Sequence, residues 1–338
     1  MILDVLTSAE VDATADAIAD WQLESGMIPW YPGGHADPWN HIEAAMALTV
    51  AGRLDAAKHA YGWLEAIQLD DGAWHQYYLA DSIEQDKLDA NVIAYIATGV
   101  WHYYLVTRDE IFLEKSWPMV ERAIDWVLEL QQPSGEILWA RHADGTPWSF
   151  ALLTGSSSMY HSLRAALAIA RERNVNCAHW VEPTERLGKV VRLQPEGAFT
   201  PKNRWAMDWY YPVLCGAING DDAVTRLAAR HDAFVMDGLG VRCVSDRPWV
   251  TTAETCETAL AYLSVGDVAT AQALFSWTRR MRTESGRYWT GEVHPDEVHF
   301  PAEEQSTYSS AAVLLADDAL GAKTPASRLF FDHAALPV

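Results

Sequence analysis

The chain has 338 residues, of which 49% are hydrophobic and 21% are charged, a composition typical of a globular protein rather than a disordered one. Its 46 acidic and 25 basic residues give a formal net charge of −21, which argues against nucleic acid, phosphate-rich polymers and anionic membranes as partners. The longest apolar runs, of about ten residues, are too short to span a bilayer.

The N-terminus carries acidic residues where a secretory signal has a basic start and a longer apolar segment. Four cysteines, Cys177, Cys215, Cys243 and Cys256, show neither C-x-x-C nor Cys/His spacing. We therefore expect buried, reduced thiols, a cytoplasmic location, no metal site and no cofactor.

A short turn phrase that ends in glycine recurs six times along the chain. The phrases are the segments 22–26, 68–72, 132–135, 194–197, 236–238 and 283–286. Their glycines lie 41 to 63 residues apart, which is the length of a helix, a turn and a second helix.

Between the phrases, apolar residues recur at helical spacing. The clearest predicted helices, in chain order, are 41–50, 54–67, 91–105, 111–130, 158–170, 223–234, 253–263, 269–281 and 308–320. The segment 175–205 is the least regular, and no helix boundaries are predicted there. Any sheet is expected to be no larger than a hairpin or two in the loops. Twelve helices in six hairpins predict an all-α (α/α)6 toroid that forms one domain over residues 1–338.

In such a toroid, the loops that lead into the inner helices surround one mouth, where the helix N-termini also gather. These mouth loops are predicted at about residues 31–41, 75–91, 139–158, 200–212, 241–254 and 288–307. Several of the 16 tryptophans and 13 tyrosines lie in them beside carboxylates. Such aromatic rings either pack in the core or stack on the apolar faces of sugars.

Several segments of the chain resemble the six-hairpin glycosidases, and most of all the glucoamylase family. Residues 87–92 resemble the Q-x-D helix of that family, and residues 101–109 and 112–118 resemble the outer helix after it. Residues 253–261, 266–271, 290–295 and 306–313 resemble its C-terminal half. The resemblance, scattered over residues 37–320, implies that Glu292 is the general base that activates water.

The general acid of that family, a Glu directly after a Trp in the third mouth loop, is missing from this sequence. Trp139 is followed by alanine, and Trp148 is followed by serine. Either another loop supplies the acid, or the substrate lies differently, or the activity has been lost.

The acid candidates are Asp37, Asp89, Asp144 and Glu254. Asp37 has tryptophan neighbours that could raise its pKa, and Asp89 begins an apolar inner helix, so these two are favoured. Asp37 could instead form a plain turn with Pro38, and Asp89 could be an N-cap. Glu303 and Glu304 are alternatives for the base, although both could serve only to pair with a helix dipole.

Further residues of the mouth loops are predicted to bind substrate. They are Trp39, His41, Tyr77, Trp148, Asp208, Trp209, Glu254, Trp289 and Glu304. The segments 75–78 and 208–211 could equally pack between hairpins. His35 and His41 are interpreted as hydrogen-bond donors to sugar hydroxyls rather than as zinc ligands. We expect Asp37, Trp39, Asp89, Asp208, Glu254 and Glu292 to share one mouth.

The stretch 32–46 resembles actinobacterial α-mannan endohydrolases that act on methylmannose polysaccharides, whose relatives are often described as prenyltransferase- or squalene-cyclase-like. We expect metal-independent hydrolysis of a neutral α-linked polysaccharide, with the inversion that the resemblance to the glucoamylase family implies. The sequence leaves oligomeric state, linkage and exo or endo action open.

Three other functions are weighed against this hydrolase. A sugar epimerase would use a pair of cavity histidines, for which His41, His75 and His102 are candidates. A non-catalytic carbohydrate-binding toroid would explain the missing acid. A terpenoid cyclase or prenyltransferase is less favoured, because Asp317-Asp318 is not a D-x-D-D motif and is expected to lie away from the mouth.

Overall fold

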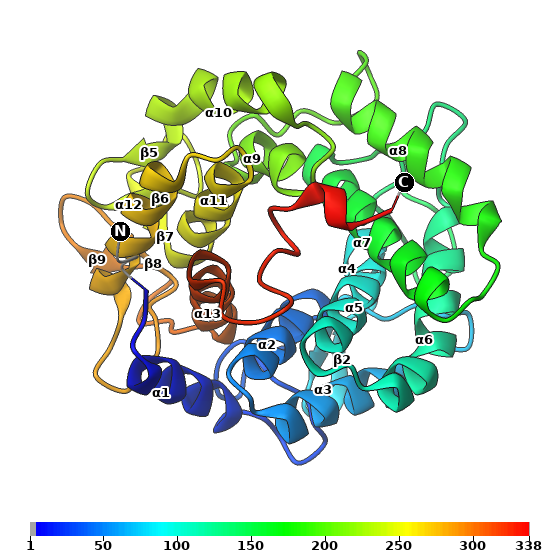
Figure 1. The fold of residues 1–338 in the computed structure, drawn as a ribbon, viewed down its shortest axis with the longest axis horizontal. Helices are drawn as coiled ribbons and strands as arrows, with labels where there is room; N and C mark the ends of the chain where they lie inside the picture. Colours follow the sequence, from blue (N-terminus) through cyan, green and yellow to red (C-terminus); the bar gives the residue numbers. More distant parts are fainter. Residues whose placement is uncertain (1–4, 338) are drawn as a thin grey trace.

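In a computed structural model, which describes residues 5–337, the helices form two concentric rings (Figure 1). The inner helices are α2 (Pro38–Val50), α4 (Ala90–Ala94) continued by α5 (Ile96–Thr107), α7 (Leu153–Glu172), α9 (Met207–Leu214), α11 (Thr252–Ser264) and α13 (Thr307–Gly321). The outer helices are α1 (Ser8–Ala19), α3 (Leu54–Ile67), α6 (Glu110–Leu128), α8 (Val181–Leu193), α10 (Gly220–Phe234) and α12 (Val268–Trp277). The predicted (α/α)6 toroid is confirmed.

Burial distinguishes the two rings. All residues of α2 except the last are buried, whereas α10 buries three residues along one stripe. A helix that is apolar nearly all round must be covered on every side, and a helix with one apolar stripe covers a surface. Within the irregular segment 175–205, the structure places a short 3-10 helix (Ala178–Trp180) followed by α8. Among residues 5–337, no helix is long and apolar enough to cross a membrane.

The recurring glycine fits against the next outer helix of the ring. At Gly72, φ is +99°, and an added Cβ would lie 2.5 Å from the backbone oxygen of Arg122 in α6. At Gly286, an added Cβ would lie 2.8 Å from the backbone oxygen of Ala13 in α1. Gly26 and Gly135 make equivalent close approaches to α3 and α8. A side chain at these positions would separate neighbouring outer helices.

A glutamine side-chain amide also links the turn to the next outer helix. Gln68 Nε2 donates to the backbone oxygens of Gly72 and Met119, each at 2.9 Å. Gln22 makes the same pair of contacts with Gly26 and α3, and Gln131, the residue directly before the third phrase, makes them with Gly135 and α8. The repeat therefore encodes the lateral spacing of the outer ring.

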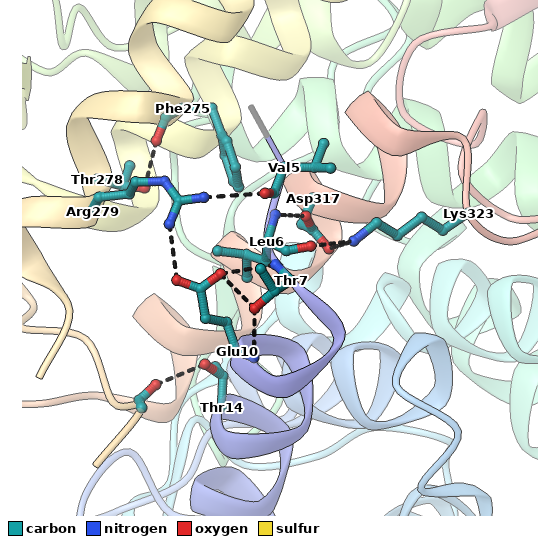
Figure 2. A network of polar contacts seen from close by, with 11 residues as sticks. Val5, Leu6, Thr7, Glu10, Thr14, Phe275, Thr278, Arg279, Asp317 and Lys323 are labelled. Atoms are coloured by element: carbon teal, nitrogen blue, oxygen red, sulfur yellow. Dashed lines mark hydrogen bonds and ion pairs between the residues drawn. The ribbon is translucent and has the colours of Figure 1, made fainter. Parts of the chain in front are cut away.

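Polar contacts close the ring between the first and last hairpins (Figure 2). The Leu6 amide donates to Asp317 Oδ1 at 2.6 Å, and Lys323 Nζ lies 2.6 Å from Asp317 Oδ2. Glu10 Oε1 lies 2.9 Å from Arg279, which follows α12. Asp317 is thus used in ring closure, away from the mouth.

The mouth loops contain short antiparallel strands. Strand β1 (Tyr77–Leu79) pairs with β2 (Ser82–Gln85), and β3 (Leu88–Asp89) pairs with β4 (Ala140–Arg141). A five-stranded sheet joins β5 (Val235–Met236), β6 (Gly240–Arg242), β7 (Trp249–Thr251), β8 (Gly291–Val293) and β9 (Val298–His299) in that order. This sheet is larger than predicted, because the neighbouring loops before α11 and α13 pair their backbones across β7 and β8.

The segment after α13 crosses the centre of the ring (Figure 1). The Arg164 guanidinium in α7 donates to the backbone oxygens of Leu336 at 2.7 Å, Pro337 at 3.1 Å and His333. The Phe330 ring stacks on His161 with centroids 5.2 Å apart. We call residues 322–337 the tail; it covers the end of the ring opposite the mouth.

Candidate active site

A cavity of about 270 Å³ opens among the N-terminal ends of the inner helices. Its walls include Asp37, Trp39, Tyr77, Asp89, Tyr211 and Tyr308. Two carboxyl groups and several aromatic rings therefore meet where the sequence predicted the mouth.

Asp37 caps α2 and lines this cavity. Its Oδ1 accepts the Asn40 amide at 3.0 Å, while Oδ2 accepts Asn40 Nδ2 at 2.6 Å and Trp30 Nε1 at 2.8 Å. The side chain is buried, and burial raises the pKa of Asp37 although these hydrogen bonds oppose the shift. Asp37 is thus a carboxyl group held in a fixed orientation with its pKa above the ordinary value.

Asp89 caps α4 on a neighbouring wall. Its Oδ1 accepts the amides of Asn91 at 3.1 Å and Val92 at 3.3 Å. Burial raises the pKa of Asp89, and Lys87, whose Nζ lies 3.3 Å from Oδ2, opposes the shift. Lys87 also lies 4.1 Å above the centroid of the Trp139 ring. This ion pair favours the ionised form of Asp89.

Aromatic rings form the platforms of the cavity. Trp39 stacks on Tyr95 with centroids 4.6 Å apart and meets Tyr308 edge-on at 5.4 Å. Tyr77 stacks on His35 at 4.3 Å. Trp39 and Tyr77 therefore lie where the sequence analysis placed them.

Glu254 lies in the first turn of α11 and is buried. The Thr251 hydroxyl donates to its Oε2. Burial and the charges of nearby acids, Glu257 foremost and Glu254 among them, raise the pKa of Tyr308. Glu254 is thus close enough to the cavity to act on one of its lining residues.

Glu292 faces the opposite way. It pairs with Val250 in the sheet, so its side chain lies on the face opposite that of Thr251, the partner of Glu254. Its Oε1 is 2.7 Å from Arg280, which follows outer helix α12, and 3.0 Å from His294 Nε2. The predicted common mouth therefore does not include Glu292, because strand alternation turns it toward the outer ring.

Two residues predicted to bind substrate pack between helices instead. His41 Nδ1 accepts the Ile28 amide at 3.1 Å, and Nε2 lies 2.9 Å from the Ala60 backbone oxygen, so both nitrogens are occupied. Trp209 Nε1 donates to the backbone oxygens of Arg226 and Leu227 in α10. The Trp209 ring stacks on Phe234 with centroids 5.3 Å apart. We correct both predictions: these side chains face outer helices.

The other predicted binding residues are not in the wall of this cavity. The hydroxyl of Thr154, which lines the cavity, donates to Asp208 at 2.7 Å, and burial raises the pKa of Asp208. Trp148 meets Trp139 edge-on at 5.1 Å. Trp289 stacks on His299 at 4.0 Å.

Glu304 belongs to a separate groove. Its Oε1 accepts the Thr290 hydroxyl at 2.8 Å. The groove also includes Trp21 and Tyr31. Glu304 is therefore outside the wall of the central cavity.

Two acids below the cavity were missed by sequence reasoning. Burial raises the pKa of Glu43 to about 7 and that of Glu257 to about 8. Glu43 follows Trp39 by four residues and Glu257 follows Glu254 by three, the spacings that keep one helix face. These spacings are the sequence pattern from which the positions of Glu43 and Glu257 near the cavity could have been predicted. Within residues 5–337, no group of three or more His, Cys, Asp or Glu is arranged to hold a metal ion.

Comparison with solved structures shows which fold this arrangement shares. A wild-type glycosidase is 15% identical, covers 93% of this chain and 96% of its own, and has a TM-score of 0.74. A GH63 mannosylglycerate hydrolase from Thermus thermophilus, in complex with Tris, is 10% identical over 90% of this chain and 99% of its own, with a TM-score of 0.70. A D-mannose isomerase is 10% identical over 92% and 97%, with a TM-score of 0.64. At these identities the likeness concerns the fold alone.

Sequence comparison is more specific. No family model matches the chain. The MMP endo-(1,4)-3-O-methyl-alpha-D-mannosidase of Mycolicibacterium hassiacum is 48% identical over 326 residues, which cover 96% of this chain and 90% of that protein. The resemblance of the stretch 32–46 thus extends over nearly the whole sequence. The chain belongs to the family of glycoside hydrolases that contains this mannosidase.

Proposed function

We propose that the chain is an endo-acting hydrolase of a neutral α-linked polysaccharide of mannose or methylmannose units, and that it inverts the anomeric centre. The observation that carries this proposal is the 48% identity to the MMP mannosidase, joined to a cavity whose wall presents carboxyls and aromatic platforms. Aromatic faces suit sugar rings, and a substrate without charge is not repelled by a net charge of −21.

Inverting hydrolysis requires one protonated carboxyl and one carboxylate, roughly 6.5–9.5 Å apart, on either side of the scissile bond. We assign the acid to Asp37, because burial raises its pKa and its contacts are hydrogen bonds rather than an ion pair. Asp89 is paired with Lys87, which favours the ionised form of Asp89, and it would bind sugar hydroxyls.

For the base, Glu254 is better supported than Glu292. Asp37 caps α2 and Glu254 begins α11, and both helices flank α13, whose Tyr308 lines the cavity. The two carboxyls would thus face a substrate from either side of Tyr308. Glu292 remains the alternative implied by the glucoamylase-like motifs, although Arg280 and His294 already engage it.

A cytoplasmic site of action is proposed with this function. Cys177, Cys215, Cys243 and Cys256 are all free thiols and buried, which suits a reducing compartment. A sugar epimerase is less well supported, because burial lowers the pKa of His41 to about 4 and that of His102 to about 3. Neither histidine then offers an acid near neutral pH.

The test is hydrolysis of methylmannose and mannose oligosaccharides by the wild type and four matched amide variants. Asp37→Asn and Glu254→Gln should lose about 10²–10⁴-fold in turnover while oligosaccharide binding persists. Asp89→Asn should mainly weaken binding. Glu292→Gln should retain turnover and lower the melting temperature.

The pattern of results separates the alternatives. Loss of turnover in Glu292→Gln with full turnover in Glu254→Gln would return the base to Glu292. A product whose first-formed anomer matches the substrate would contradict inversion, and wild-type protein that leaves every oligosaccharide intact would contradict the hydrolase itself.

A further inference from the structure

Next to the cavity, five buried residues and the half-buried Tyr308 form two neighbouring sets of hydrogen bonds between hydroxyl and carboxyl groups. We call Glu43, Tyr95, Tyr210, Tyr211, Glu257 and Tyr308 the tyrosine–carboxyl belt. Its members come from α2, the junction of α4 and α5, α9, α11 and α13. Its hydrogen bonds therefore join α2 to the α4–α5 junction, and α11 to α9 and α13.

Glu257 is the centre of this belt. Its Oε1 accepts the Tyr308 hydroxyl at 2.6 Å and the Tyr211 hydroxyl at 3.4 Å, and its Oε2 accepts the Tyr210 hydroxyl. Tyr211 and Tyr308 also line the cavity. A single carboxyl thus sets where two cavity hydroxyls point.

Glu43 contacts the cavity wall indirectly, through Tyr95 and Trp39. Its Oε1 accepts the Tyr95 hydroxyl, and the Tyr95 ring stacks under Trp39 at 4.6 Å. Trp39 in turn meets Tyr308 edge-on at 5.4 Å. The orientation of the main aromatic platform therefore depends on both carboxyls.

We propose that Glu43 and Glu257 are positioning residues, which orient Trp39, Tyr211 and Tyr308 for the sugar bound in the cavity. This inference rests on the proposed function of the cavity as a sugar site. Neither carboxyl lines the cavity itself, so their effect on a sugar passes through the three aromatic side chains.

The protonation of the belt supports this role. With pKa values raised by burial to about 7 for Glu43 and about 8 for Glu257, both carboxyls carry a proton in mildly acidic solution. The titratable groups that face Glu257 are Glu43, Tyr95, Tyr210, Tyr211, Cys243, Glu254, Cys256 and Tyr308. A carboxylate formed at Glu257 at higher pH would hold the tyrosine hydroxyls more strongly and place a charge beside Glu254.

The matched control is the same kind of pair at a distance from the cavity. The Tyr104 hydroxyl donates to Glu172 Oε1 at 2.6 Å between the C-terminal parts of α5 and α7. Glu172→Gln therefore removes a carboxyl–tyrosine bond without touching the belt, and it should leave kcat, KM and the pH profile unchanged.

The experiment measures kcat and KM against pH for Glu257→Gln, Glu257→Ala and Glu43→Gln on the oligosaccharide that the wild type cleaves. We expect kcat/KM of Glu257→Ala to fall about tenfold to a hundredfold, with partial rescue in Glu257→Gln, since one or two oriented hydroxyls are lost. Wild-type kcat/KM should change as pH passes 8, because Glu257 then becomes a carboxylate, and this change should be absent from Glu257→Gln. Folded variants with wild-type kcat, KM and pH profile would overturn the inference.

A double-mutant cycle covers the case in which Glu257→Ala does not fold. If Glu257 acts through Tyr308, Glu257→Gln should have little further effect on kcat/KM in a Tyr308→Phe background. Full additivity of the two changes would contradict that route.

A readout without substrate separates this inference from the proposed function. The near-ultraviolet circular dichroism of the stacked Trp39 and Tyr95 should change between pH 6 and 9 in the wild type, and not in a Glu43→Gln/Glu257→Gln variant. If the wild type is inactive but shows this titration, the proposed hydrolase function is contradicted and the inference about Glu43 and Glu257 is supported. If the wild type is active but its spectrum does not depend on pH, the inference about Glu43 and Glu257 is contradicted.

Discussion

Asp37 combines two roles that a single carboxyl can fill at the start of an inner helix. Its backbone position makes it the N-cap of α2, and its side chain stays in the cavity wall because Asn40 and Trp30 donate to it there. Asp89 does the same at α4. Helix N-termini that converge on a mouth therefore supply carboxyls whose orientation is already fixed by capping.

Glu43 and Glu257 make the stability of the protein depend on pH. Their carboxyls titrate at about 4.5 when unfolded and at about 7 and about 8 when folded. A raised folded pKa means that their stabilising contribution is complete below pH 4.5 and is lost as pH rises to 8. Each group lowers the free energy of unfolding by at most about 1.4 kcal/mol per pH unit in that window.

The measurement is urea unfolding of the wild type and of Glu43→Gln/Glu257→Gln between pH 5 and 9. The double variant should lose much of the slope of stability against pH, because its amides do not titrate. Equal slopes in the two proteins would show that the carboxyls are ionised throughout.

Residue identity predicted the capping acids but not the direction of side chains within helices. Asp37 and Asp89 could be found because an acid before an apolar helix marks an N-terminus. His41 and Trp209 could not be placed, because a helix that is buried all round gives no polar stripe from which to read its rotation. Glu43 and Glu257 were missed for the same reason. Glu292 was wrongly placed at the mouth because strand alternation was not predicted in its loop.

At the scale of elements, the glycine phrases predicted the ring because they record contacts between outer helices. Gly26, Gly72, Gly135 and Gly286 all approach the backbone of the next outer helix, whereas Gly197 and Gly238 have no atom within 4 Å of an added Cβ. Spacing alone revealed the repeat, and only packing explains why these four positions exclude a side chain. The sheet β5–β9 could not be predicted, since its strands are two or three residues long.

Comparison of Gly72→Ala with Gly197→Ala tests whether the close approach of the glycine to the next outer helix contributes to stability. Both positions have positive φ, +99° and +84°, but an added Cβ collides with Arg122 at Gly72 and meets open space at Gly197. Gly197→Ala should cost about 1 kcal/mol of unfolding free energy from backbone strain, and Gly72→Ala should cost clearly more. Thermal or urea unfolding measures both, and equal losses would mean that the close approach carries no energy.

At the scale of the whole molecule, both ends of the chain complete the toroid: the N-terminal segment closes the ring, and the tail covers one end of it. The contacts of Leu6 and Glu10 with Asp317 and Arg279 join the first hairpin to the last (Figure 2). The tail then covers the far end, where Phe330 packs beside Glu43 and Glu257 of the belt. The ring and its floor are thus fixed by residues from both termini.

Removal of residues 325–338 should expose the underside of the belt. Arg164 would lose three backbone acceptors, and His161 would lose its stacked partner. We expect a lower melting temperature and stronger fluorescence of a dye that binds apolar surface, because inner-helix residues would become accessible to water. An unchanged melting temperature and dye signal would show that the tail lies on the ring without stabilising it.

Because the tail lies across the end of the ring opposite the mouth, the toroid has the form of a cup rather than an open tunnel. Under the proposed function, a polysaccharide would enter this cup through the mouth, and both pieces of a cut chain would leave by the same opening. Internal cleavage would then require the polymer to bend into the cavity, with its two arms extending outward over the edge of the mouth. Both product chains would be released after each cut. This arrangement favours non-processive cleavage, in which the protein binds a polymer anew for every cut.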